Sequence, residues 1–321
     1  MVDAEDLVAL VRQGWGREAV RLEPITLGFD ADARTFRADT SDGKALFLKF
    51  RRTCAPGIGV SRILRELGID AVLAPLPTLT GELAQANPEG WLLAYPFVQG
   101  ENGFQRPPTL AQWRVFGAAL RQIHDTPPTA FPSIQQEDFR AVGYRPLSDL
   151  FDAPPPGKLG TLIERHRATI ERVLTRTVEL GEACRAQSWK SVLCHADAHV
   201  GNVLLEPDGR LHLIDWDAPR IAPRERDLMF VTKGGIASEH GPAEEAAFID
   251  GYGPASPDPL ALAYYRYAWA TDDLASYSDE TLHPAPDDPT QGGKALHYFA
   301  HLFEPGQIVA SAFAHDHRES Q

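Results

Sequence analysis

The segment that most limits the possible folds of this chain is CHADAHVGNVLLEPDGRLHLIDWD, residues 194–217. Two short strand-like runs, residues 203–206 and 210–214, flank a Pro-Asp-Gly turn, a pattern typical of a tight β-hairpin. Asn202 enters the hairpin and Asp215 leaves it. Because paired strands lie about 5 Å apart, we expect these two side chains to lie side by side.

The polar residues around this hairpin suit magnesium-dependent phosphoryl transfer. An amide oxygen from Asn202 and a carboxylate from Asp215 can share one Mg²⁺, which requires oxygen ligands and takes few of them from protein. Asp197, on the loop that leads into the hairpin, can accept a proton from a substrate hydroxyl. A base followed by two metal ligands is the order that phosphoryl transfer uses. We expect His195 to hold this loop rather than to react.

A zinc-dependent hydrolase is an alternative interpretation of the same segment. His195, Asp197 and His199 are spaced by two residues, and zinc favours imidazole nitrogen. No helical H-E-x-x-H pair stands nearby, which weighs against this alternative.

Charge and composition restrict the partners of the chain. A formal net charge of −13 argues against nucleic acid and favours cationic small molecules, although such a charge also serves solubility. We expect no membrane partner, because no apolar run approaches the ~18 residues of a membrane span. The N-terminus lacks a signal-peptide pattern, and the three separated cysteines fit a reducing compartment. These features predict a cytoplasmic protein and indicate no particular oligomeric state.

The hydrophobic pattern divides the chain into a sheet-rich part and a helical part. Residues 35–38 and 45–50 flank an Asp-Gly turn, a short helix carries its apolar face at Val60 and Leu64, and residues 91–104 form a last strand broken by a proline and a glycine. Later helices are expected from Thr109 to Pro127 and over 158–187, 242–251, 258–276 and 290–303. We place the lobe boundary after Val98, giving lobes 1–98 and 99–321.

The central motif also resembles a known family. His195-x-Asp197-x-x-x-x-Asn202, followed by Asp215-Trp216-Asp217, is similar to the catalytic and metal loops of the protein-kinase-like superfamily, and more closely to the aminoglycoside phosphotransferase family. Within that family, IDWDAPRIAPRERDLMFV is particularly similar to the spectinomycin phosphotransferases, and QIHDTP resembles a common helix end. The resemblance implies an α+β, bilobal protein-kinase-like fold, with a small antiparallel-sheet N-lobe and a larger, mainly helical C-lobe.

The resemblance also implies roles for individual residues. Asp197 would be the catalytic base, Asn202 and Asp215 the Mg²⁺ ligands, and Lys49 the contact to the α/β-phosphates of ATP. Asp227 would cap the next helix or brace the catalytic loop. The remaining nucleotide contacts would come from the phosphate-covering segment 26–38 and the adenine-binding segment 93–98, with Gly28, Tyr95, Phe97 and Val98 as candidates.

Two features depart from the family pattern. The phosphate-covering segment contains one glycine, Gly28, instead of a G-x-G-x-x-G run. The family also places an acid on the helix after the lysine strand, paired with that lysine. Glu66 is the nearest candidate, but it lies ~120° from the centre of the apolar stripe at 100° per residue.

The expected activity is transfer of a phosphoryl group from ATP to a hydroxyl of a small cationic acceptor. An aminoglycoside or aminocyclitol antibiotic such as spectinomycin is favoured, with a role in antibiotic resistance. A choline-, sugar- or amino-alcohol-like metabolite is the alternative acceptor. A catalytically inactive kinase-like binding protein is a further alternative, against which the retained motif residues argue. The candidate acceptor contacts are Asp217, His199, Asp272 and Asp273, although acids on a helix are at least as often simply solvated.

Overall fold

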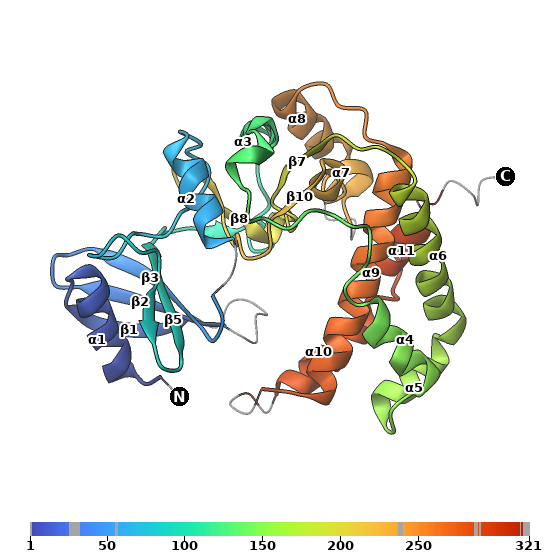
Figure 1. The fold of residues 1–321 in the computed structure, drawn as a ribbon, viewed down its shortest axis with the longest axis horizontal. Coiled ribbons are helices and arrows are strands. Elements are labelled where there is room, and N and C mark those ends of the chain that lie inside the picture. Colours follow the sequence, from blue (N-terminus) through green and yellow to red (C-terminus); the bar gives the residue numbers. More distant parts are fainter. Residues whose placement is uncertain are drawn as a thin grey trace.

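The computed structural model describes residues 2–25, 33–54, 57–236, 240–285, 288, 290–314 and 316. It has two lobes (Figure 1): a sheet with α1 forms one end of the molecule, and a group of long helices forms the other. The mixed α+β, bilobal architecture that the sequence predicts is confirmed. None of the described helices has the length and hydropathy needed to cross a bilayer.

The N-terminal lobe is a five-stranded sheet of order β1-β2-β3-β5-β4, with antiparallel pairing throughout. Alternate residues of β3 point to opposite faces. Leu46 and Leu48 pack on the apolar side of α1, whereas Lys49 lies on the opposite face. The strands are Ala19–Ile25 (β1), Ala33–Thr40 (β2), Ala45–Arg51 (β3), Gln85–Asn87 (β4) and Gly90–Pro96 (β5), and α1 spans Ala4–Trp15.

The chain leaves this sheet after Pro96, so the last strand is shorter than the expected 91–104. The next strand, β6 (Glu101–Asn102), pairs instead with β8 (Val203–Leu205) in a second sheet. Pro96 at the end of β5 and Gly100 just before β6 account for the break, since proline lacks the N–H that a sheet requires. The boundary at 98/99 remains our proposal.

The hairpin around Pro207 is confirmed. Strand β8 pairs with β9 (Leu211–Leu213), and the Ile214 N–H donates to the Asn202 carbonyl at 3.0 Å. Two flanking strands, β7 (Ser191–Cys194) and β10 (Arg220–Pro223), pair with each other beside it. Both ends of the hairpin are thereby fixed next to one another at the base of the C-terminal lobe.

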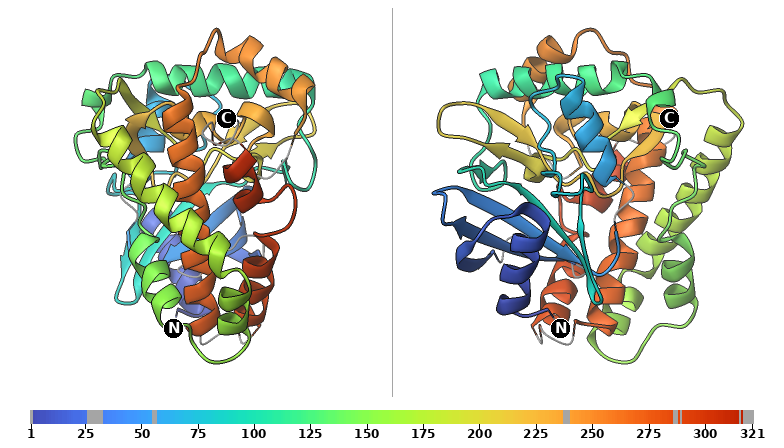
Figure 2. Two further views of the ribbon diagram at one scale, coloured as in Figure 1. Left: turned by 90° about the vertical axis from the view of Figure 1, so that its right-hand side faces the viewer. Right: turned by 60° about the vertical axis from the view of Figure 1, so that its left-hand side comes forward.

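Helices build the rest of the C-terminal lobe around α9 (Figure 2). The central helix runs from Pro259 to Leu282, beyond the expected end at 276, and it buries Tyr264, Tyr265 and Tyr267. The other α-helices of the described chain are Ile58–Glu66 (α2, between the lobes), Leu110–Asp125 (α3), Tyr144–Asp152 (α4), Lys158–Arg165 (α5), Arg167–Arg185 (α6), Glu225–Leu228 (α7), Pro242–Tyr252 (α8), Gln291–His301 (α10) and Ile308–Ala314 (α11).

The single helix expected over 158–187 is wrong in one respect. His166 separates α5 from α6 with φ −104° and ψ 16°, outside helical geometry. Its ring stacks on Phe303 with centroids 3.9 Å apart. Both sides of the break keep the helical apolar period, so periodicity alone gives no sign of this tertiary contact.

Candidate active site

A buried carboxylate, Asp227, holds the catalytic loop through hydrogen bonds to its backbone. One carboxylate oxygen accepts the His195 N–H at 2.8 Å and lies 3.0 Å from His124 Nε2, and the other accepts the Ala196 N–H at 2.7 Å. Burial on its own would raise the pKa of Asp227, but the hydrogen bond and charge of His124, together with those other donors, hold it below its ordinary value. Of the two expected roles, Asp227 has the bracing one.

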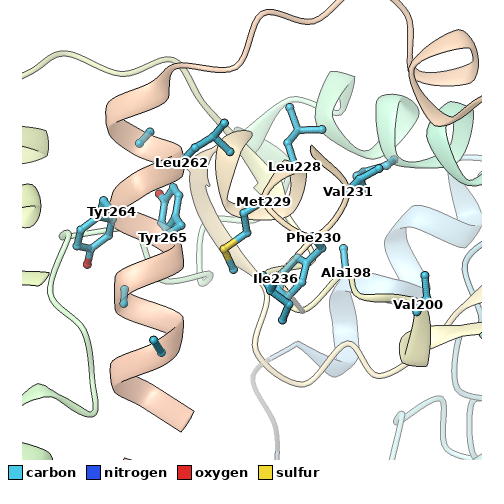
Figure 3. Close-up of a cluster of buried hydrophobic side chains, with 14 of the residues drawn as sticks. Ala198, Val200, Leu228, Met229, Phe230, Val231, Ile236, Leu262, Tyr264 and Tyr265 are labelled. Carbon is cyan, nitrogen blue, oxygen red and sulfur yellow. The ribbon is translucent and has the colours of Figure 1, made fainter. Parts of the chain in front are cut away.

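Apolar packing fixes the same loop from the other side. Ala198 and Val200 lie beside the segment after Asp227, whose side chains Met229 and Phe230 fill the space toward α9 in the same buried cluster (Figure 3). His195 contributes through its ring, which packs against Trp216 with centroids 4.4 Å apart, and Nε2 lies 2.9 Å from the Ile214 carbonyl. This agrees with a loop-holding His195. Ala196 adopts a left-handed φ of 70°, which turns the chain between two fixed neighbours.

Asp197 and Asn202 are held together at the mouth of the hairpin. Asn202 Nδ2 donates to the Asp197 carbonyl at 2.9 Å and to its carboxylate Oδ2 at 2.7 Å. The second oxygen, Oδ1, is buried and has no hydrogen-bond partner among the described residues, and His199 Nε2 lies 3.3 Å from it. The His199 ring is fixed by the Gly201 N–H on Nδ1 at 3.0 Å and by stacking on Phe104. Asp197 therefore presents an oriented carboxylate.

Lys49 joins the two lobes at this point. Its Nζ lies 2.9 Å from Asp215 Oδ1 and 2.6 Å from Asp217 Oδ2, across more than 160 residues of sequence. Burial on its own would lower the pKa of Lys49, but the charges of the two aspartates raise it above its ordinary value. Arg51, two residues along the same face of β3, forms an ion pair with Asp217 as well.

Asn202 and Asp215 fit a magnesium ion in their chemistry. Since the side-chain contacts of Asn202, to Asp197 and to His199, all run through Nδ2, its amide oxygen is the atom left for a cation. Asp215 is 38% exposed and sits at a left-handed φ of 64°, just after the second strand of the hairpin. Two oxygen donors and an open side match the way Mg²⁺ is bound in phosphoryl-transfer enzymes, where substrate phosphates and water complete the shell.

The acid expected opposite Lys49 on α2 is not there. Glu66 pairs with Arg62 on the surface at 2.7 Å, and its side chain is 58% exposed. The inner face of α2 consists of Ile58, Val60, Ser61 and Leu64. Sequence reasoning missed Arg51, although its place two residues after Lys49 puts it on the same face of the strand.

The residues expected at the nucleotide have different surroundings. Tyr95 shares the sheet face of Lys49, and burial together with the charges of Asp217 and Asp215 raises the pKa of its phenol. The Phe97 ring lies under the Arg37 guanidinium at 4.6 Å, and its N–H donates to the Ala45 carbonyl. Val98 is partly buried just beyond the strand, while Gly28 lies outside the described residues.

The two candidate acids on α9 have separate environments. Asp272 accepts the Gly143 N–H at 2.7 Å and thereby holds the start of α4. Asp273 has its pKa raised well above the ordinary value by burial and by the charges of Asp272 and Asp197, against a hydrogen bond from the Trp269 indole. Asp273 is therefore the member of the pair that is electrostatically close to the candidate base.

The zinc interpretation finds no support in the geometry. Within the described part of the chain, the one group of three side chains close enough to share a metal is His124, Cys194 and Asp227, which is fully buried. His195 and His199 engage separate backbone groups, and no shared ligand set with Asp197 results.

Comparison with known proteins agrees with this geometry. The model of the phosphotransferase enzyme family matches residues 22–265. A crystal structure of spectinomycin phosphotransferase APH(9)-Ia with ADP and spectinomycin is 29% identical, with a TM-score of 0.87 and coverage of 98% of this chain and 99% of that one. Protein StrN of Streptomyces griseus is 25% identical over 244 residues, which is 71% of this chain and 70% of that protein. Choline kinase LicA of Streptococcus pneumoniae, at 16% identity and a TM-score of 0.62 over 97% of both chains, shares the fold.

Proposed function

The chain belongs to the phosphotransferase enzyme family, and we propose that it transfers the γ-phosphoryl group of ATP to a hydroxyl of an aminocyclitol, with spectinomycin as the leading acceptor. The observation that carries this proposal is the convergence of Asp197, Asn202, Lys49 and Asp215 at one point between the lobes. The similarity to the spectinomycin enzyme over nearly the whole of both chains favours that acceptor class.

The chemistry assigned to these residues is positional and electrostatic. Asp197 accepts the proton of the acceptor hydroxyl. At the same time the hydroxyl oxygen of the acceptor forms a bond to the γ-phosphorus, and the bond from that phosphorus to the leaving ADP oxygen breaks. Asn202 orients Asp197 through Nδ2. Lys49 reaches the phosphates, and Mg²⁺ held by Asn202 and Asp215 would neutralise charge on them. We assign the adenine contacts to Tyr95, Phe97 and Val98 as a further part of this proposal.

The acceptor side is acidic and aromatic. Asp273 lies in the electrostatic range of Asp197, and Trp269 beside it packs edge-on against Phe230. An acceptor ammonium would stabilise the ionised form of a carboxylate that burial otherwise disfavours. We assign amine recognition to Asp273, while Asp272 is engaged by Gly143. His199 contacts Asp197 and Asp217 contacts Lys49, so neither is our first choice for an acceptor contact.

The test is ADP release by purified protein with Mg-ATP and a panel of acceptors: spectinomycin, other aminocyclitols, aminoglycosides, choline and small amino alcohols. We expect the highest kcat/KM for an aminocyclitol, with the phosphorylated product identified by mass spectrometry. In the Asp197→Asn variant, kcat should fall by about 10³ while Mg-ADP affinity stays within about threefold. Preferential turnover of choline would show that the acceptor is a metabolite and not an antibiotic. Near-normal turnover by Asp197→Asn would show that Asp197 is not the catalytic base.

A role in antibiotic resistance follows if spectinomycin is the acceptor. Expression of the wild-type chain in a susceptible host should then raise the inhibitory concentration of spectinomycin, whereas expression of Asp197→Asn at the same level should not.

A further inference from the structure

The phosphate lysine of this chain needs an anchor that α2 does not supply. The only acid of α2, Glu66, stands at its last residue and pairs with Arg62. Without such an anchor the Lys49 side chain would populate several rotamers, because lysine has a flexible four-carbon stem, and its ammonium group would have no fixed position. A residue elsewhere in the molecule must therefore fix Lys49.

Asp217 has the geometry of that anchor. Its Oδ2 lies 2.6 Å from Lys49 Nζ, closer than the 2.9 Å contact to Asp215 Oδ1. The same carboxylate forms an ion pair with Arg51, whose side chain is 12% exposed. Lys49 and Arg51 thus flank one carboxylate from the same face of β3, so Asp217 is attached to the strand at two points. Asp215, by contrast, has one contact to Lys49 and a side chain that is 38% exposed.

The start of α2 abuts the segment that carries Asp217. A Cβ atom at Gly57, the residue before α2, would lie 1.9 Å from the Trp216 carbonyl oxygen and 2.4 Å from Pro219 Cδ. A side chain therefore does not fit at this position, and the backbone at the helix start packs directly against the segment that carries Asp217. The helix is therefore connected to Lys49 through backbone packing and Asp217, and not through a side chain of its own.

We propose that Asp217, held by Arg51, is the positioning residue for Lys49 and takes the place of a helix glutamate. The inference rests on the proposed phosphoryl transfer. When nucleotide binds and Asp215 faces the metal ion, Asp217 keeps one side of the Lys49 ammonium occupied and directs its remaining N–H donors toward the phosphates. Arg51 ties the Asp217 carboxylate to the strand that carries Lys49, beside the carboxylate of Asp215.

A double-mutant cycle tests this arrangement. In the wild-type background, Asp217→Asn should lower kcat/KM for Mg-ATP by about a hundredfold, the effect of a small misplacement of a catalytic group. In a Lys49→Met background the same change should lower it by less than about threefold, because coupled residues are not additive. Equal losses in both backgrounds would overturn the proposal, since they would show that Asp217 acts independently of Lys49.

Magnesium titration separates this role from metal binding. The Mg²⁺ concentration for half-maximal rate should change less than about twofold in Asp217→Asn and rise at least about tenfold in Asp215→Asn. An equal rise in both variants would make Asp217 a metal ligand and overturn the proposal.

Two matched controls and one second variant complete the design. Glu66→Gln and Asp208→Asn, which remove surface acids paired with Arg62 and Arg210, should stay within about twofold of wild type. A loss in Glu66→Gln as large as that in Asp217→Asn would return the anchor role to α2. If thermal unfolding shows that Asp217→Asn does not fold, Arg51→Gln takes its place in the cycle. We expect Arg51→Gln to lower kcat/KM for Mg-ATP by about tenfold in the wild-type background and to have no such effect in the Lys49→Met background.

The readout is chosen to be independent of the acceptor. Rates are measured as slow ADP release to water without acceptor, and the same cycle is repeated on the Mg-ADP dissociation constant by calorimetry. A wrong acceptor would leave both cycles unchanged. Wild-type protein that releases no ADP under any condition would refute the proposed function, and the binding cycle would still support or overturn the Lys49–Asp217 coupling.

Discussion

Asp272 and Asp273 are neighbours on α9 with different surroundings. Asp272 accepts a backbone N–H of Gly143, whereas the electrostatic partner of Asp273 on the site side is Asp197. We expect Asp273→Asn to raise KM for a cationic acceptor by about tenfold or more with little change in KM for ATP, because a buried carboxylate–ammonium contact is lost. Asp272→Asn should instead lower the thermal unfolding midpoint. Steady-state kinetics of both variants with one aminocyclitol measure this, and equal KM values for the two would contradict it.

Asp227 makes the stability of the protein depend on pH. The folded state holds its pKa below the ordinary value of about 3.9, so its ionised form adds stability above that pH. This contribution is lost as pH falls toward the folded-state pKa. We expect Asp227→Asn to lower the free energy of unfolding by about 3 kcal/mol at pH 7, since a buried bonding partner of His124 is removed.

Urea unfolding of wild type and Asp227→Asn at a series of pH values measures the effect. The difference between the two proteins should shrink as pH falls below about 4. A difference that stays constant from pH 7 to pH 3 would show that the ionised carboxylate is not what braces the catalytic loop.

At the scale of elements, α2 is the helix whose position matters most for the site. Gly59, within α2, has open space where the Cβ of an alanine would lie. Gly57, the residue before α2, has no such space. Gly57→Ala should destabilise the protein by about 1–3 kcal/mol through overpacking and lower kcat, because it displaces the segment that carries Asp217. Gly59→Ala should stabilise it by about 0.5 kcal/mol with activity unchanged.

Thermal unfolding and ADP release on the two alanine variants check this pair. The substitution is chemically the same in both, so any difference reports on the contact of Gly57 with Trp216 and Pro219. Equal stability of the two variants would mean that the start of α2 is not tightly packed against the segment of Trp216 and Pro219.

For the molecule as a whole, the net charge of −13 should speed the arrival of cationic acceptors. We expect kcat/KM for a poly-ammonium aminocyclitol to fall several-fold as NaCl rises from about 0.01 to about 1 M, because the Debye length shortens from about 30 to about 3 Å. A mono-ammonium alcohol should show a shallower dependence. Equal salt slopes for the two acceptors, measured at saturating Mg-ATP, would show that the field of the protein does not guide the acceptor.

Much of the site could be inferred from sequence because it is local. Asp197, Asn202 and Asp215 lie within 19 consecutive residues, and an Asp-Gly turn makes the hairpin that unites the last two nearly obligatory. These features depend on short-range backbone geometry, which the residues themselves set.

The partner of Lys49 could not be obtained in this way. Its contact with Asp217 joins residues 168 positions apart and depends on how the sheet docks on the hairpin. Family expectation placed the partner on α2, where Glu66 turned out to face solvent. The break at His166 is similar, because its cause is a ring on another helix.

The sequence by itself thus determined the reaction chemistry, since turn residues and strand alternation bring a base and two oxygen ligands to one hairpin end. Tertiary structure alone decided which distant charges meet: Asp217 with Lys49 and Arg51 across the two lobes and, within the C-terminal lobe, Asp227 with His124 and Asp273 with Asp197 in its electrostatic surroundings. The physical reason is that a long-range ion pair is selected by the packing of whole elements, and identical side chains would pair differently if those elements packed in another way.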